Sequence, residues 1–195
     1  KKMNEVFLEV VIAPGFGENA LETLEAKKNL RVINAQALAG KQKEFDGKTV
    51  LNGLLWQDCD NVLLESFESV TKRKPTESEK RDLNFAWVVC KYVKSNAIVL
   101  AKGLQTIGLC GGQTNRVDCV KISGERAQKF GFDTKGSVMA SDAFFPFKDS
   151  VEKAVELGVT AIIQPGGSLR DAESVAECDA NGIAMIYTKT RHFRH

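Results

Sequence analysis

The sequence predicts an α/β fold whose sheet is mostly parallel in its last part. From Ser137 onward, apolar runs typical of buried strands alternate with helical patterns, and such alternation favours a parallel sheet flanked by helices. A strand–helix–strand order also opens the chain, and a strongly capped helix stands near its middle. The 195 residues fit one domain of ordinary size or two small lobes.

The first part of the chain is expected to form a βαβ unit. Residues 6–12 are apolar and β-branched and end in the turn signal "APG", so they predict a buried strand. Residues 18–29 place apolar side chains on one helical face and end in basic residues, which suit the helix dipole. Residues 30–36 then predict a second strand, and residues 46–58 predict one or two strands around Gly53.

The clearest predicted helix covers residues 73–93. Thr76 and Glu79 have the spacing of a capping box, and an apolar stripe follows them along the helix. Residues 96–113 predict two strands that are hinged at the Lys-Gly pair 102–103.

The remaining chain alternates between helices and strands. Residues 114–131 predict a helix that is interrupted near Gly124. The later elements are expected as a strand at 137–142, a helix at 149–158, a strand at 159–167, a helix at 168–182 and a strand at 183–189. Ser168 is expected to cap its helix. Ligands of such sheets bind outside the carboxyl ends of the strands, so the site is expected there.

Composition excludes several classes of function. The net charge is +2 with both signs mixed along the chain, which gives no indication of binding to nucleic acid or to a membrane. No apolar run approaches the roughly 18 to 20 residues of a membrane span, and no signal-peptide pattern is present. The five cysteines are scattered, and we expect buried, reduced thiols in a cytoplasmic protein. The first residue is not Met, which suggests a piece of a longer protein.

Two segments share one design. "IGLCGGQTNRV" and "AIIQPGGSLRD" each run from a strand through paired glycines to a helix. Glycines let a backbone approach a ligand closely, and a helix N-terminus offers N–H groups to an anion. The alternative is that each Gly-Gly pair only makes a tight turn, because neither standard nucleotide-binding fingerprint is present.

Asn96 and Arg116 are candidate site residues. Asn96 follows the capped helix and precedes a buried strand, so it either terminates the helix or fixes an amide or amine of a ligand. Arg116 is predicted in the first turn of a helix, where the dipole disfavours a basic residue, and a residue that breaks a local rule is a functional candidate.

Two further segments are chemically unusual. The tail "TRHFRH" contains both histidines, His192 and His195, and is either a frayed basic end or an extension that the preceding strand carries to the ligand-binding edge. The stretch "SDAFFPFKDS" contains three Phe and Pro146, which suits neither a regular strand nor a surface loop. Its aromatic rings either face a flat ligand or fill the core. No CxxC, HxE, HExxH or GxSxG pattern occurs, so no metal is expected.

Four long motifs carry a family resemblance. They are "VVIAPGF", "KSNAIVLAKGLQTIGLCGGQTNRVDC", "SDAFFPFKDSVEKAVELGV" and "AIIQPGGSLRDAESVAECDANGIAMIYTKTRHFRH". Together they resemble the C-terminal part of the AICAR transformylase domain in the bifunctional AICAR transformylase/IMP cyclohydrolase family. The resemblance implies that residues 1–195 are part of that domain and that the upstream lobe and the cyclohydrolase domain are absent from this chain. It also implies a cytidine-deaminase-like mixed sheet flanked by helices, without the deaminase zinc site.

The resemblance implies a reaction and its partners. The family transfers a formyl group from 10-formyltetrahydrofolate, a cosubstrate, to the 5-amino group of AICAR, and the partner domain closes the product FAICAR to IMP. No metal is expected to be required for the formyl transfer. A homodimer, or pairing with the first transformylase lobe, is expected in the cytoplasm.

The resemblance also assigns residues to two subsites. Asn96 resembles the asparagine beside the reacting amine, where it has an orienting role. The AICAR contacts that it implies are Glu9, Asn96, Phe144, Arg191 and Phe193, with Arg191 on the phosphate and His195 as a possible addition. The folate contacts that it implies are Arg116, Asp149, Ser168 and Leu169. Two positions depart from the family pattern: Glu9 stands where some relatives have Asp, and Leu169 stands where a small residue is expected.

One absence limits what the chain is expected to do. The family's catalytic Lys-His motif lies in the upstream lobe, and no Lys-His pair occurs in these residues. The isolated chain is therefore expected to be inactive. The alternatives to a transformylase lobe are a non-catalytic nucleotide- or folate-binding module that needs a partner chain, and a purely structural oligomerisation piece.

Overall fold

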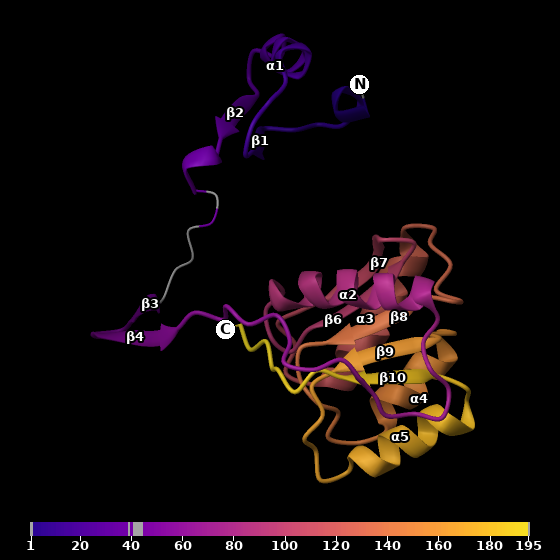
Figure 1. The fold of residues 1–195 in the computed structure, drawn as a ribbon. Helices are drawn as coiled ribbons and strands as arrows, with labels where there is room; N and C mark the ends of the chain where they lie inside the picture. The colour runs from indigo at the N-terminus through magenta and orange to yellow at the C-terminus, as the bar shows by residue number, and fades with distance from the viewer. Residues whose placement is uncertain (1, 39, 41–44, 195) are drawn as a thin grey trace. The chain divides into compact units, whose positions relative to one another are not determined.

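The fold is described from a computed structural model, in which residues 2–38, 40 and 45–194 are described. The chain divides into two compact units, Lys1–Asn61 and Val62–His195. Of the two arrangements that the length allows, the chain therefore has two units. Figure 1 labels most of their helices and strands.

The first unit begins with the expected βαβ arrangement. Its elements are the 3₁₀ helix Lys2–Glu5, β1 (Val10–Ala13), α1 (Glu18–Glu25), β2 (Arg31–Asn34) and the 3₁₀ helix Gln36–Leu38. β1 and β2 pair in parallel, as the strand–helix–strand pattern predicted. The predicted first strand started too early, because residues before Val10 are not in a ladder. The expectation that it is buried is also wrong, because Val10 and Ile12 are exposed.

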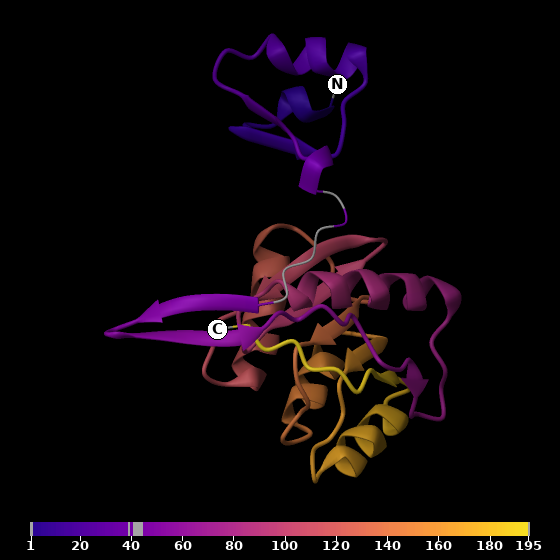
Figure 2. The ribbon, with the colours of Figure 1, turned by 60° about the vertical axis from the view of Figure 1, so that its left-hand side comes forward.

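A two-stranded ribbon completes the first unit. β3 (Phe45–Val50) and β4 (Gly53–Asp58) pair antiparallel, so residues 46–58 contain two strands rather than one (Figure 2). The rings of Phe45 and Trp56 stack with their centroids 5.5 Å apart. Gly47 lies beneath Trp56, and a Cβ there would come 3.1 Å from the indole. Glycine therefore makes room for the cross-strand aromatic pair.

The second unit is built on one mixed sheet. Its elements are β5 (Glu68–Ser69), α2 (Glu77–Lys91), β6 (Ile98–Lys102), β7 (Gln105–Cys110), α3 (Arg116–Lys129), β8 (Val138–Ser141), α4 (Asp149–Glu156), β9 (Ala161–Gln164), α5 (Asp171–Ala180) and β10 (Ala184–Tyr187). The strand order is β5-β10-β9-β8-β6-β7. β8, β9 and β10 run parallel, and the other pairs run antiparallel. The mixed sheet flanked by helices is confirmed.

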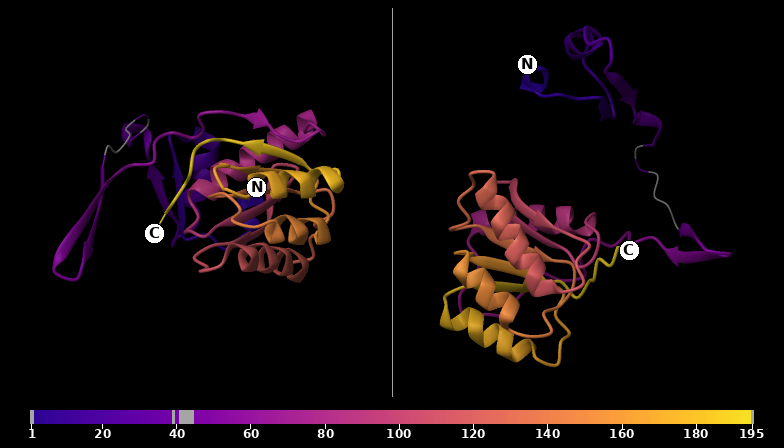
Figure 3. Two further views of the ribbon diagram at one scale, coloured as in Figure 1. Left: turned by 90° about the horizontal axis from the view of Figure 1, so that it is seen from below. Right: turned by 180° about the vertical axis from the view of Figure 1, so that it is seen from behind.

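Helices cover both faces of this sheet. The α2 side chains Leu83 and Trp87 pack against one face, on which the alternate β6 residue Val99 lies. The neighbouring Ile98 and Leu100 face the opposite cluster, which includes buried residues of α3, α4 and α5. Figure 3, viewed from behind, shows these three helices side by side. Because adjacent residues of β6 are buried in opposite cores, the central strands read as continuous apolar runs.

Local signals located the helix ends with mixed success. The capping box is confirmed, since Glu79 N donates to Thr76 Oγ1 at 3.3 Å and Thr76 N donates to Glu79 Oε2 at 2.7 Å. The expected break at Gly124 is wrong, because α3 runs through it and Leu157 occupies the space beside it. The Ser168 cap is also wrong, because α5 begins only at Asp171.

The cysteines are mostly buried, as expected. Cys90, Cys110, Cys119 and Cys178 are buried, Cys59 is intermediate, and all are free thiols. Among the described residues, no helix is both long enough and apolar enough to span a membrane.

Candidate functional site

Several strand ends of the second unit meet at one edge of its sheet. The carboxyl ends of β7, β8, β9 and β10 and the amino end of β6 share that edge. The segments that leave it carry Asn96, Arg116, Phe144, Ser168 and Arg191. This is the edge at which the sequence predicted a ligand site.

A pocket with a volume of about 230 Å³ lies at this edge. Its lining residues are Asn96, Thr114, Asn115, Arg116, Ala143, Phe144, Pro146 and Phe193. They come from the residues before β6, the start of α3, the loop after β8 and the C-terminal segment. The structure thus brings Asn96, Arg116, Phe144 and Phe193, all predicted as ligand contacts, to one cavity.

Arg116 is held by a network of its own chain. Its side chain is 7% exposed and forms an ion pair with Asp142, which is fully buried. Its Nη1 also donates to Ser141 Oγ at 3.0 Å, and its Nη2 donates to Asn96 Oδ1 at 2.7 Å. A buried counter-ion therefore stabilises the basic residue that the helix dipole disfavours.

The amide of Asn96 is fixed in one orientation. Its Nδ2 donates to the carbonyls of Gln113 at 3.0 Å and Thr114 at 3.2 Å, while its Oδ1 accepts from Arg116. Both N–H donors are used within the protein, and the oxygen has the capacity for a second hydrogen bond. Asn96 is thus suited to accept a hydrogen bond from a ligand N–H rather than to donate one.

Arg191 and Phe144 also come together. The Arg191 guanidinium lies over the Phe144 ring, with Cζ 4.9 Å from the ring centroid, in a cation–π arrangement. Arg191 is exposed, and a Cβ added at Gly167 would come 3.5 Å from its Nη2. The guanidinium therefore lies between the aromatic loop and the glycine turn after β9, where it can meet an anion.

The glycine pair after β9 uses its N–H groups internally. Gly166 N donates to Gln164 Oε1 and Gly167 N donates to Asp171 Oδ2, both at 2.7 Å. Gly166 also lies against the Tyr187 ring, which a Cβ would approach to 2.8 Å. Because a carboxylate already occupies the Gly167 N–H, the tight-turn alternative describes this pair better than an anion cradle.

The glycine pair after β7 has the same explanation. A Cβ at Gly111 would come 2.3 Å from Val93 Cγ1, and Gly112 N donates to the Lys94 carbonyl at 2.8 Å. These glycines let the backbone pack closely against the end of α2. The close approach that the sequence predicted is real, but the partner is the chain itself.

The three Phe of the aromatic loop have different environments. Phe145 is fully buried in the core, so the core-filling alternative holds for it. Phe147 is 50% exposed, with the Arg170 guanidinium 4.9 Å from its ring centroid. Pro146 lines the pocket beside Phe144. The loop therefore presents two of its rings outward and inserts one into the core.

The residues predicted for the folate side, apart from Arg116, lie outside the pocket lining. Asp149 begins α4, and its Oδ1 accepts from Ser150 N at 2.7 Å. Ser168 Oγ accepts from Arg170 N at 3.1 Å, and Leu169 is fully exposed. All three follow β8 or β9 at the same edge of the sheet.

Two predicted residues stand apart. Glu9 is exposed and lies directly before β1 in the first unit. His195 lies outside the described residues.

Sequence reasoning missed Asp142. This carboxylate also accepts from Ala97 N at 3.1 Å and from Ser95 Oγ at 2.5 Å. The signal was an acidic residue at the end of a buried apolar strand, because a buried carboxylate needs a partner. The partner is Arg116, the basic residue that its helix position did not explain.

Sequence reasoning also underrated His192. Its ring is fully buried against Trp87, with centroids 4.5 Å apart, and one ring nitrogen lies 2.9 Å from the Leu63 carbonyl oxygen. Its backbone N donates to the Asp142 carbonyl at 3.0 Å. The frayed-end alternative is therefore wrong for this part of the tail, which is anchored in the core.

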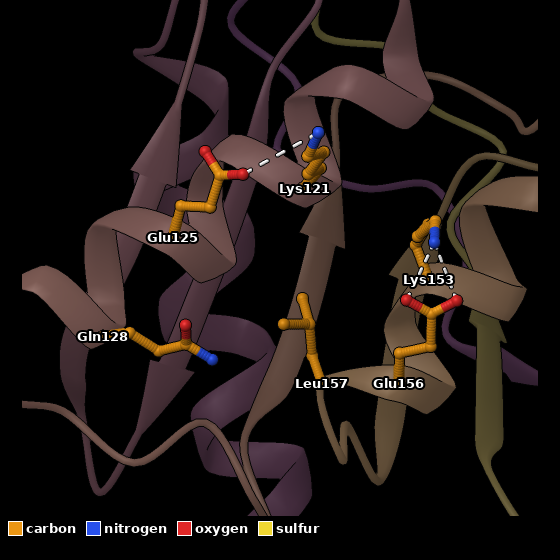
Figure 4. Close-up of a pocket in the computed structure, with 6 residues that line it drawn as sticks. All are labelled: Lys121, Glu125, Gln128, Lys153, Glu156 and Leu157. Carbon is orange, nitrogen blue, oxygen red and sulfur yellow. Dashed lines mark hydrogen bonds and ion pairs between the residues drawn. The ribbon is translucent and has the colours of Figure 1, made fainter.

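A second pocket, of about 140 Å³, lies between α3 and α4 (Figure 4). Lys121 and Glu125 are 3.9 Å apart, and Lys153 is 2.7 Å from Glu156. These charged side chains are exposed and paired, and no residue predicted for a site lies among them. It is a groove between two solvent-facing helices.

Metal and thiol chemistry find little support. Within residues 2–38, 40 and 45–194 no group of three or more His, Cys, Asp or Glu side chains could hold a metal ion. Burial raises the pKa of Cys178 to about 12 and that of Cys90 well above its ordinary value. Thiols with such pKa values are poor nucleophiles at neutral pH.

Comparisons with known proteins point to one family. A family model described as "AICARFT/IMPCHase bienzyme" matches residues 1–126. Proteins described as "Bifunctional purine biosynthesis protein PurH" are 53% identical over 195 residues in Aquifex aeolicus, 47% over 196 in Persephonella marina and 51% over 196 in Caldicellulosiruptor saccharolyticus. Each alignment covers 100% of this chain and 38% of the relative, so the chain spans well under half of those proteins.

A solved structure was also similar. A diaminohydroxyphosphoribosylaminopyrimidine deaminase/5-amino-6-(5-phosphoribosylamino)uracil reductase from Thermotoga maritima aligns with a TM-score of 0.37 and 18% sequence identity. The alignment covers 57% of this chain and 35% of that one.

Proposed function

The chain belongs to the AICARFT/IMPCHase bienzyme family, and from this premise we propose that it is part of the formyl-transferring half of such an enzyme. In this proposal the complete protein transfers a formyl group from 10-formyltetrahydrofolate to AICAR, and this chain supplies one wall of the substrate site. The parent protein would also close FAICAR to IMP. The motifs after β7, β8 and β9 support the assignment to the transformylase rather than to the cyclohydrolase half.

The pocket at the carboxyl edge of the sheet carries this proposal. Asn96, Arg116, Phe144 and Phe193 meet there, although Asn96 and Phe193 are almost 100 positions apart in the chain. The surroundings combine an aromatic ring, a guanidinium and a fixed amide oxygen. A flat base with an exocyclic amine and a phosphate, as in AICAR, would use all three of these groups.

Each AICAR contact has a distinct task in this proposal. The Asn96 oxygen accepts an N–H of the 5-amino group and so orients its lone pair toward the formyl carbon. Phe144 and Phe193 lie against the imidazole, and Arg191 binds the phosphate with a charge-assisted hydrogen bond.

The formyl donor would lie on the other side of the same edge. We propose that 10-formyltetrahydrofolate is bound by Arg116, Asp149, Ser168 and Leu169. We assign His195 to the AICAR side instead. Because Arg116 already bonds Ser141, Asp142 and Asn96, its contribution to the folate is at most through the remaining edge of the guanidinium.

In this proposal the chemical step also needs the family's Lys-His motif, which does not occur in this sequence. A weakly nucleophilic amine requires a base and a stabilised oxyanion as it attacks the formyl carbon and releases tetrahydrofolate. The family's Lys-His motif would come from the upstream lobe, as part of the same protein or of a second subunit. We propose that this step requires no metal. We also propose that the complete enzyme is a homodimer in the cytoplasm.

A direct assay tests the proposal. The full-length protein should form tetrahydrofolate when it is mixed with AICAR and 10-formyltetrahydrofolate, and the Asn96→Ala variant should lose most of this rate. The matched control is Asn181→Ala, at the end of α5. If the protein binds AICAR but transfers no formyl group to it, the binding-module alternative is favoured. If the protein closes FAICAR to IMP but does not formylate AICAR, the cyclohydrolase half is favoured.

A further inference from the structure

Asp142 is bonded to segments on two sides of the pocket, the one that carries Asn96 and the C-terminal one. It is fully buried and lies directly after β8. The next residues along the chain, Ala143 and Phe144, line the pocket themselves. The sequence motif draws attention to the aromatic residues that follow Asp142 rather than to Asp142 itself.

The carboxylate of Asp142 organises the first wall. Its Oδ1 accepts from Ala97 N at 3.1 Å and also from Arg116, and its Oδ2 accepts from Ser95 Oγ at 2.5 Å. The residue between Ser95 and Ala97 is Asn96, which thus has a neighbour on each side bonded to the same carboxylate. Arg116 adds a third link, because its Nη2 holds the Asn96 oxygen.

The carbonyl of Asp142 organises the C-terminal wall. It accepts from His192 N at 3.0 Å, and the neighbours of His192 are Arg191, over the Phe144 ring, and the pocket residue Phe193. Ser95 joins the two walls, since its Oγ accepts from Arg194 N at 3.1 Å while it donates to Asp142. One residue therefore connects segments that are separated by about half of the chain.

We propose that Asp142 is a positioning residue for the nucleotide subsite, whose carboxylate sets the Asn96 amide through Arg116, Ser95 and Ala97. This inference rests on the proposed function, because it takes Asn96 to be a substrate contact. Asp142 itself does not line the pocket, so it acts through the residues that it holds.

The physical reason lies in the buried charge. Arg116 is almost fully buried, and its fork-shaped guanidinium is oriented by the one carboxylate that it pairs with. Without that charge, the guanidinium would be drawn toward water or toward the ligand, and it would no longer be fixed on the Asn96 oxygen. The amide could then turn, and the acceptor that faces the substrate amine would be lost.

A double-mutant cycle in the full-length protein tests this inference. Asp142→Asn keeps the shape but removes the charge, and we expect AICAR binding, measured by calorimetry, to weaken about tenfold, or about 1.4 kcal/mol. In an Asn96→Ala background the same substitution should change the affinity less than about twofold, because groups that act as a unit are not additive. Equal weakening in both backgrounds, or no weakening at all, would overturn the proposal.

A crystal structure of the Asp142→Asn variant gives a second readout that does not depend on AICAR. We expect the Arg116 Nη2 to have left the Asn96 oxygen, from which it is 2.7 Å away in the wild-type chain. An unchanged contact would contradict the proposal. If the wild-type protein binds no AICAR, the proposed function fails, while this structure still decides the role of Asp142.

Two further variants guard against a simple loss of folding. Glu79→Gln removes another ion pair, with Arg73, near the amino end of β9 at the opposite sheet edge, and it should leave AICAR affinity unchanged. If Asp142→Asn does not fold, Arg116→Lys retains the buried positive charge but cannot bond three partners in a fixed fork. If Arg116→Lys binds AICAR as tightly as the wild-type protein does, the proposal is wrong.

Discussion

At the scale of single residues, the site is a set of side chains that fix one another before any ligand arrives. Arg116 holds the Asn96 oxygen, and Arg191 lies over the ring of Phe144. Preorganisation of this kind lowers the ordering cost of binding.

Arg191 is the best isolated test of the phosphate contact. Arg191→Ala should weaken AICAR binding by about 1.5 to 3 kcal/mol, which is the range for a charged hydrogen bond. Isothermal calorimetry on the full-length protein measures this directly. Arg170→Ala, which removes the similar cation–π contact with Phe147, is the matched control and should have little effect on AICAR. Wild-type affinity in Arg191→Ala would refute the assignment.

Asp149 tests the other substrate. It is at the start of α4, where its carboxylate also suits the helix dipole, so the isosteric Asp149→Asn is the mildest change. We expect the KM for 10-formyltetrahydrofolate to rise more than the KM for AICAR. Steady-state kinetics with each substrate varied in turn measures both. The reverse pattern would mean that the two subsites have been exchanged.

At the scale of elements, some helix boundaries follow from local sequence signals and others depend on tertiary contacts. The start of α2 could be predicted from its capping box, because both partners lie within one turn of the helix. The start of α5 could not be predicted in this way. Ser168 Oγ accepts from the nearby Arg170 N, and the helix with its acidic first turn begins only at Asp171. Likewise Gly124 does not break α3, since its missing side chain makes room for Leu157.

The capping box should stabilise the second unit. Thr76→Ala removes the oxygen that accepts from Glu79 N, and we expect a loss of about 1 kcal/mol in the free energy of unfolding. Urea denaturation followed by circular dichroism measures it. Ser78→Ala, two positions after the cap, is the control: it removes a side-chain contact with the Thr76 hydroxyl at 3.1 Å but leaves the bond from Glu79 N, so it should cost much less. Equal losses in the two variants would show that the cap contributes nothing specific.

Glu79 adds a pH dependence with a definite sign. Burial by itself would raise its pKa, but hydrogen bonds from Arg73 and from Thr76 N outweigh burial and hold the pKa below its ordinary value of 4.5. A lowered folded-state pKa stabilises above the unfolded value, and the gain is lost as pH falls through the folded value. The stability difference between wild type and Glu79→Gln should therefore shrink as pH falls from 7 to below 4.5. A difference that is independent of pH would contradict this.

At the scale of the whole molecule, the second unit holds the complete six-stranded sheet and both core clusters around it. Residues 62–195 alone should therefore unfold in a single cooperative transition. Thermal denaturation monitored by circular dichroism checks this. A gradual, non-cooperative melt would show that the first unit is needed for the fold.

The chain by itself should not catalyse formyl transfer. The proposed base is absent from it, and proximity of base, amine and donor supplies much of the barrier reduction in such reactions. Tetrahydrofolate formation by residues 1–195 should stay at background, while the full-length protein turns over. A rate near the typical enzyme value of about 10 per second would show that the base lies in this sequence. His195 would then be substituted first.

The sequence by itself determined the order and type of most elements and the family. Apolar strands, the capping box and long ordered motifs are local properties, so the strand–helix alternation could be read without coordinates. It also marked Arg116, because a basic residue in the first turn of a helix breaks a local rule, and through the family resemblance it marked Asn96, Phe144, Arg191 and Phe193.

Only the tertiary structure decided which of these residues meet and what holds them. Asp142 and Arg116 are 26 positions apart, and Asp142 and His192 are 50 apart, so neither contact has a local pattern. The same holds for the glycine pairs, whose neighbours proved to be Val93 and Tyr187 rather than a ligand. Sequence reveals what a side chain can do, but its partner depends on the pairing order of the strands, which long-range packing fixes.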